Sequence, residues 1–170
     1  PMQYVAELYD SLMDTGTEFG IENFGTYAMN SLRMEKAYKG WGSELTTEIT
    51  PNEAGLERFV DFSKSFIGRE ATLSRKLLGI NTKLVYLDVD ANDTDCLGNE
   101  PVLNGEQIIG VTTSGAYGHT VRKSLAFAYV HPQYADTGTN FEIRILGQNC
   151  SATVLKEAAY DPQNLRLKDV

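Results

Sequence analysis

The chain has 170 residues, of which 42% are hydrophobic and 22% charged, a composition typical of a globular protein that can bury a sizeable core. The formal net charge is −8 at pH 7, and the lysines and arginines are scattered, which argues against binding to nucleic acid or to an anionic membrane surface. No apolar run approaches the roughly 20 residues that a transmembrane helix needs.

The first part of the chain has helical spacing. Apolar residues recur every three or four positions over residues 4–13, which predicts a helix with one buried face that ends near Gly16. Similar spacing predicts a second short helix over residues 24–33. The pattern then fails over residues 35–42, where a loop or an irregular strand is expected.

A helix-start signature follows at residues 50–53, with the sequence TPNE. The threonine is the predicted N-cap, the proline takes the first helical position, and the glutamate lies three residues after the cap. Because Gly55 follows so closely, only about one turn can form. A strand or edge segment is expected over residues 56–62, and a further helix over residues 67–77.

The sequence becomes rich in strand-forming residues after Gly79. Residues 83–89 alternate in character and predict a strand. Asn104-Gly105 is the strongest short hairpin signal in the chain. Further strands, separated by turn-forming residues, are expected over residues 108–113, 124–130, 141–146 and 152–155. Five or six strands without an intervening helix predict a small antiparallel barrel or sandwich, so the fold class is α+β, with a boundary between residues 78 and 79.

Arg33 is the first candidate for a binding residue. A guanidinium is a planar fork of donors that matches a carboxylate and stays charged at any working pH. The alternative is an internal ion pair with Glu35 or Glu53 that holds the neighbouring loop, and both roles can coexist. Glu35 could also orient Arg33 toward a ligand.

Trp41 is the second candidate, the only tryptophan of the chain, with a glycine on each side. A flat indole ring can stack on an aromatic ligand, which contributes ~0.5–1.5 kcal/mol beyond the buried area. The alternative is a tryptophan that covers the seam between the two domains. Tyr38, nearby, is expected to be a core or wall residue.

Other groups of polar residues carry weaker signals. Residues 88–95 place acidic side chains at the first positions of a calcium loop, but Asp93 and Asn99 stand where glycine and glutamate are needed, so a solvated acidic turn is expected. His119 and His131 lie in different turns and do not predict a metal site. The two cysteines lack metal or redox spacing and are expected to be free thiols in a reducing compartment.

Two blocks of the sequence resemble the folate-dependent aminomethyltransferases, a family that includes the glycine-cleavage T-protein and the C-terminal region of dimethylglycine and sarcosine dehydrogenases. The first block is SLRMEKAYKGWGSELTTEITPNEAGL, residues 31–56. The second comprises the segments EPV, NGE, GVTTSG and KSLAFAYV within residues 100–130. Both blocks follow the order of the family, and the last segment is closest to the dehydrogenase branch.

The resemblance implies a division of the chain into two parts. Residues 1–78 would be the C-terminal part of the folate-binding subdomain, and residues 79–170 the C-terminal β-barrel. It places Arg33 at the folate pocket and an aromatic residue at Trp41 near the bound folate. The catalytic carboxylate and the acidic residue that recognises the pterin would both lie upstream of Pro1, so no catalytic residue and no metal ligand is expected here.

The resemblance also implies a function. The parent protein would transfer a one-carbon unit from an N-methyl amine, such as dimethylglycine or sarcosine, to tetrahydrofolate, with FAD held only in a missing upstream domain. The alternatives are a fragment of a stand-alone T-protein or folate-dependent demethylase, and a folate-binding module without activity. In each case the missing N-terminal half of the module is the expected partner. The parent is expected to be an enzyme and this chain alone inactive, in the cytoplasm or, in a eukaryote, the mitochondrial matrix.

Overall fold

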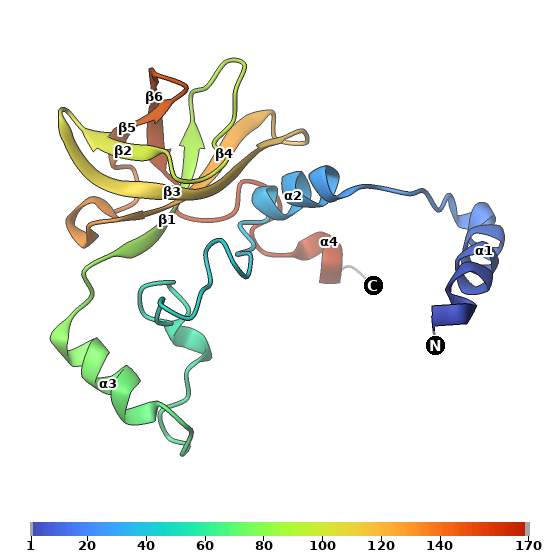
Figure 1. The fold of residues 1–170 in the computed structure, drawn as a ribbon, viewed down its shortest axis with the longest axis horizontal. Coiled ribbons are helices and arrows are strands. Elements are labelled where there is room, and N and C mark those ends of the chain that lie inside the picture. The colour runs from blue at the N-terminus through green and yellow to red at the C-terminus, as the bar shows by residue number, and fades with distance from the viewer. Residues whose placement is uncertain (1, 169–170) are drawn as a thin grey trace.

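A closed antiparallel barrel forms the largest folded unit of the computed structural model, which describes residues 2–168 (Figure 1). Its strands are β1 (Lys83–Val89), β2 (Pro101–Asn104), β3 (Gln107–Gly118), β4 (Lys123–Val130), β5 (Asn140–Ile145) and β6 (Gln148–Val154). Around the barrel they run in the order β1-β4-β3-β2-β5-β6, and β6 pairs with β1 to close it. The predicted α+β fold with a small antiparallel barrel is therefore confirmed.

The strand predictions differ from the structure mainly at β2, at β3 and at β6, which begins at Gln148 and not at the predicted residue 152. β2 is a short strand that was not predicted, and β3 extends beyond the predicted segment to Gly118. The predicted hairpin at Asn104-Gly105 is confirmed: Asn104 ends β2 and pairs with Gln107, and Gly105 and Glu106 form the turn into β3. β2 has only four residues, too few for a clear alternation of apolar and polar positions.

Strands β1 and β4 are buried on both faces, which explains why their sequences are apolar almost throughout. One face fills the barrel interior, where Leu87 is completely buried. The other face, with Tyr86 and Phe127, packs under a helix and contacts Met34. The barrel is thus attached to the preceding part of the chain by a second apolar cluster.

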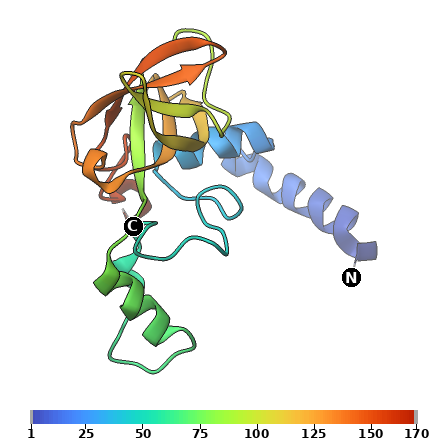
Figure 2. The same ribbon diagram turned by 60° about the vertical axis from the view of Figure 1, so that its left-hand side comes forward.

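The helices are α1 (Val5–Gly16), α2 (Thr26–Glu35), α3 (Arg69–Leu78) and α4 (Leu165–Lys168), and 3-10 turns cover Met2–Tyr4, Thr17–Phe19, Glu57–Phe59 and Pro132–Tyr134. Among the helices of residues 2–168, α2 makes the most extensive contact with the barrel wall, at β3 and β4. Figures 1 and 2 show α1 and α3 projecting away from the barrel in different directions.

Two predictions in this part of the chain are wrong. Helix α1 forms, but it has no buried face: its apolar residues Leu8 and Leu12 are 60% and 55% exposed. The reason is that α1 lies away from the barrel (Figure 1) and contacts adjoining segments, such as Asn23, whose side chain donates to the hydroxyl of Tyr9 at 2.8 Å. The strand expected over residues 56–62 is instead a 3-10 turn followed by loop, because no strand of residues 2–168 lies beside it.

The helix-start signature at Thr50 forms the predicted single turn, over residues 51–55, which does not continue into a helix. The backbone N–H of Thr50 donates to Oε2 of Glu53 at 2.8 Å, and the N–H of Glu53 donates back to Oγ1 of Thr50 at 3.3 Å, which is a capping box. The carbonyl of Glu53 accepts the N–H of Leu84 at 2.9 Å. This single turn therefore fixes the loop before it onto the start of β1.

Within residues 2–168, no helix is both long and apolar enough to cross a bilayer. Cys96 is buried, Cys150 is half-buried, and both are free thiols. In the acidic stretch of residues 88–95, which begins within β1, Asp88 pairs with Lys123, and Asp95 accepts a hydrogen bond from Ser124 at 2.6 Å.

Candidate binding site around Arg33 and Trp41

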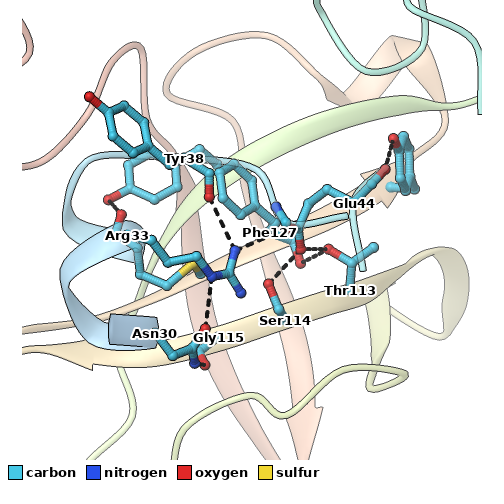
Figure 3. Close-up of polar contacts among 12 residues, drawn as sticks. Asn30, Arg33, Tyr38, Glu44, Thr113, Ser114, Gly115 and Phe127 are labelled. Carbon is cyan, nitrogen blue, oxygen red and sulfur yellow. Dashed lines mark hydrogen bonds and ion pairs between the residues drawn. The ribbon is translucent and has the colours of Figure 1, made fainter. Parts of the chain in front are cut away.

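Arg33 and Glu44 form an ion pair where the end of α2 meets the following loop (Figure 3). Nη1 of Arg33 lies 3.0 Å from Oε2 of Glu44, and the same oxygen accepts the backbone N–H of Gly40 at 2.6 Å. The Glu44 side chain is completely buried, whereas that of Arg33 is 19% exposed. The pair therefore has one end inside the protein and one end at its surface.

The second carboxylate oxygen of Glu44 binds the barrel. Oε1 accepts hydrogen bonds from the hydroxyls of Thr113 at 2.7 Å and Ser114 at 2.5 Å, two consecutive residues of β3. Consecutive side chains of a regular strand point to opposite faces. Here the pairing of β3 with β4 shifts register between Thr112 and Ser114, and this bulge allows both hydroxyls to reach Glu44.

Three hydrogen bonds fix the guanidinium of Arg33. Nε donates to Oδ1 of Asn30 at 2.8 Å, and Nη1 donates to the carbonyl of Tyr38 at 3.2 Å as well as to Glu44. Asn30 is itself held by the carbonyl of Gly115 on β3, at 3.1 Å. None of the hydrogen bonds of Arg33 among the described residues uses Nη2. The group is held rigidly and keeps donors for an anion.

The two ion-pair partners that the sequence suggested for Arg33 are wrong, as is the role of Glu35 in orienting it. Glu35 is buried, and its Oε1 accepts the backbone N–H groups of Thr120 and Val121, at 2.6 and 3.2 Å, in the turn between β3 and β4. Glu53 closes the capping box with Thr50. Both carboxylates satisfy nearby backbone groups, and Glu44 takes the place beside Arg33.

Trp41 lies at the tip of the loop between Arg33 and Glu44, and it is 76% exposed. The flanking glycines explain the local shape. A Cβ at Gly40 would lie 3.3 Å from Oε2 of Glu44 and 3.7 Å from Cζ of Arg33, so a side chain there would crowd the ion pair. Gly42 has a φ of +92°, which other residues rarely adopt.

The exposure of Trp41 and Tyr38 distinguishes between the roles that the sequence left open for them. Trp41 covers no seam within the described chain, because most of its surface is open. Tyr38 is 49% exposed and is not a core residue; its carbonyl, not its ring, takes part in the site. Both rings can therefore be reached by a ligand or by another polypeptide.

Buried polar groups support the site from below. The hydroxyl of Tyr129 on β4 donates to the backbone carbonyl of Glu44 at 2.8 Å, and burial raises the pKa of this phenol well above its ordinary value. The hydroxyl of Tyr86 donates to the carbonyl of Met34 at 2.7 Å, and burial raises its pKa to about 12. Both phenols stay protonated at neutral pH and donate hydrogen bonds to these carbonyls.

The sequence did not identify Glu44, Thr113 or Ser114 as parts of the site. The three residues have no spacing that a sequence pattern could detect, because they meet only when the loop after α2 folds onto β3. Glu44 has one local feature that could have been noticed in the sequence: it lies four residues after Gly40, and its carboxylate accepts the N–H of Gly40. The bulge in β3 gave none.

Two family models match this chain. The model described as the GCVT N-terminal domain matches residues 1–64, and the model described as the glycine cleavage T-protein C-terminal barrel domain matches residues 82–161. The chain belongs to the glycine-cleavage T-protein family. In this family member the first match contains Arg33, Glu44 and Trp41, and the second contains the β-barrel.

Curated relatives of this T-protein family member include proteins with different names. Mitochondrial dimethylglycine dehydrogenase from Homo sapiens is 45% identical over 152 residues, which are 88% of this chain and 18% of that protein. An aminomethyltransferase from Thermoanaerobacter pseudethanolicus is 35% identical over 161 residues, 94% of this chain and 44% of that protein. The mitochondrial pyruvate dehydrogenase phosphatase regulatory subunit from Mus musculus is 38% identical over 144 residues, 81% of this chain and 16% of that protein.

A solved structure has the same fold. The glycine cleavage system aminomethyltransferase T from Bartonella henselae superposes with a TM-score of 0.85 at 24% identity, over 95% of this chain and 45% of that chain. The T-protein family member described here therefore spans less than half the length of each of these relatives.

Proposed function

We propose that this chain is the C-terminal part of a tetrahydrofolate-binding aminomethyltransferase module. In the full-length protein, the module would take a one-carbon unit from an N-methyl amine such as dimethylglycine or sarcosine. The dehydrogenase branch is favoured because dimethylglycine dehydrogenase is 45% identical, against 35% for the aminomethyltransferase. A fragment of a stand-alone T-protein or of a folate-dependent demethylase is the alternative within the family.

The proposal rests on the hydrogen bonding of the Arg33 guanidinium. Its Nε and Nη1 are used by the protein, and its Nη2 makes no hydrogen bond with the described residues. A folate has a glutamate tail with two carboxylates and an aromatic body. A guanidinium that is already fixed in position and has unused donors can bind a carboxylate. The exposed ring of Trp41 can stack on an aromatic ring.

The chemistry assigned to this chain is binding and orientation. Bound tetrahydrofolate would supply the nitrogen that accepts the one-carbon unit, and Arg33 and Trp41 would hold its tail and body. Glu44 is unsuited to proton transfer, because Arg33, Gly40 and two β3 hydroxyls occupy its carboxylate. We therefore place the catalytic carboxylate, and any FAD, in the part of the protein upstream of Pro1.

We further propose that residues 1–78 and 79–170 are the two domain parts of this chain, and that the missing N-terminal half of the module covers the exposed face of the first. Helix α1 has no buried residue, and apolar side chains near Arg33, such as Tyr27, Met29 and Leu32, are more than half exposed. A cytoplasmic or mitochondrial-matrix location follows from this proposal, and two relatives are named as mitochondrial.

A second candidate function is a folate-binding regulator without catalytic activity. The relative named as a regulatory subunit of pyruvate dehydrogenase phosphatase is 38% identical, which shows that this part of the family is not limited to proteins named as enzymes. A longer chain that binds folate but turns over no methylated amine would favour this function.

Anaerobic calorimetric titration with tetrahydrofolate tests the proposal, on this chain and on a longer chain that contains the upstream half. We expect binding by the longer chain at least, and a loss of about tenfold or more in affinity for Arg33→Ala, because a charge-assisted hydrogen bond contributes ~1.5–3 kcal/mol. The matched control is Arg58→Ala, which removes an exposed arginine outside the network. Absence of binding by both chains would refute the proposal.

A further inference from the structure

A hollow lies beside the loop that follows α2. It has a volume of about 230 Å³, is open to solvent on one side, and is lined by this loop, by β1 and by the segment after β6. Ala54, Leu84 and Phe127, which are at most 9% exposed, form its floor, and Lys39 and Lys156 contribute ammonium-bearing side chains. Neither Arg33 nor Trp41 lines it, so it is separate from the site described above.

Lys39 is the unusual residue of this hollow. It is half-buried, yet no carboxylate of residues 2–168 lies within 4.0 Å of its Nζ, the limit for an ion pair. Other partly buried cations of the chain are paired: Arg33 binds Glu44, and Lys36 lies 3.2 Å from Asp161. A half-buried ammonium without a counter-ion is unfavourable, because burial removes part of its hydration.

The charges around Lys39 do not compensate for this. Burial lowers the pKa of its ammonium, and the neighbouring Arg58 lowers it further, against smaller opposite effects of Glu57 and Glu44. The carboxylate of Glu44 is already bound by Arg33 and β3. Glu157 lines the same hollow but is exposed to water and is not paired with Lys39. An anion in the hollow would therefore interact more favourably with the Lys39 ammonium than a water molecule does.

We propose that this hollow binds a small organic carboxylate with an apolar body. The carboxylate accepts hydrogen bonds from Lys39 and Lys156, and the apolar body lies on Ala54, Leu84 and Phe127. The size limits the ligand, because sites for drug-sized molecules have volumes of roughly 300–1,000 Å³, larger than this hollow. The site is independent of the proposed folate function.

The test uses three probes of matched size or charge, observed by the NMR amide shifts of residues 37–39 and 154–158. Benzoate carries both the carboxylate and the apolar body, benzyl alcohol lacks the charge, and inorganic phosphate lacks the apolar body. We expect saturable binding of benzoate in the millimolar range, and little or no binding of the other two. Equal affinity for benzyl alcohol or for phosphate, or no saturable shift with benzoate, would overturn the proposal.

Two variants complete the test. Lys39→Gln keeps the length of most of the side chain and removes the charge, and we expect the affinity for benzoate to fall about tenfold. Lys83→Gln is the control, because Lys83 is exposed at the start of β1 and does not line the hollow. If both variants bind benzoate as the natural sequence does, Lys39 is not part of a carboxylate site. Because no folate is present, this outcome is independent of the proposed function.

Discussion

Nη1 of Arg33 lies 3.0 Å from Oε2 of Glu44, and through Glu44 the guanidinium is connected to Thr113 and Ser114 of the barrel. One carboxylate thus joins α2, the loop with Trp41, and β3. The structural role and the binding role that the sequence left open for Arg33 are compatible, because different nitrogen atoms serve them. Arg33 is rigid because Glu44 holds it, and a rigid guanidinium loses less entropy when it binds an anion.

Glu44→Gln should destabilise the chain by about 3 kcal/mol, because it leaves the mostly buried charge of Arg33 without its partner. The free energy of unfolding, measured by urea denaturation, checks this. Glu48→Gln is the control: Glu48 is exposed in the same loop, and its loss should change stability by less than about 0.5 kcal/mol. Equal effects of the two substitutions would show that the ion pair contributes no stability.

Trp41→Leu should leave the free energy of unfolding almost unchanged, because the ring is 76% exposed and supports no core. In the longer, folate-binding chain the same substitution should weaken tetrahydrofolate binding by about three- to tenfold, the loss of one aromatic contact. Calorimetry measures the affinity. Phe59→Leu, another exposed aromatic position, serves as the control. Unchanged affinity with Trp41→Leu would remove the indole from the folate site.

The sequence predicted the barrel better than the part before it, for a physical reason. β1 and β4 are buried by the chain itself, so their patterns reflect contacts that are present. The apolar pattern in α1 predicts a buried face, but residues 2–168 do not cover this face. The prediction would be correct only if another polypeptide covered it. Arg33 and Trp41 could be selected from their chemistry. Glu44 could not, because it meets Arg33 through a loop closure and a β3 bulge that no local pattern encodes.

Stability at alkaline pH should depend on Tyr86. Burial raises the pKa of its phenol to about 12 in the folded chain, from 10.0 when unfolded. Below pH 10 both states are protonated; above it the unfolded state loses the proton first, so stability falls as the pH rises from about 10 to 12. Tyr86→Phe should lower stability at neutral pH by about 1 kcal/mol, through loss of the bond to Met34, and make the alkaline decline shallower.

Urea denaturation at several pH values measures this effect. Tyr129 contributes a similar decline, because burial also raises the pKa of its phenol, so Tyr86→Phe should reduce the slope without abolishing it. Tyr27→Phe is the matched control, since Tyr27 is 94% exposed. An identical alkaline decline in the Tyr86→Phe variant and in the natural sequence would contradict the prediction.

Asn52→Leu should stabilise the chain. The side chain of Asn52 is buried in the turn after Thr50, and neither its Nδ2 nor its Oδ1 has a hydrogen-bond partner among the described residues. Burying an unpaired amide costs about 1–3 kcal/mol, and leucine has a similar size without polar atoms, so we expect a gain of roughly this amount. Chemical denaturation measures the gain, and Asn81→Leu, at an exposed position near β1, should give none. A loss of stability in Asn52→Leu would mean that the amide is satisfied in solution, for example by a bound water molecule in the small hollow that Asn52 lines with Glu57 and Lys76.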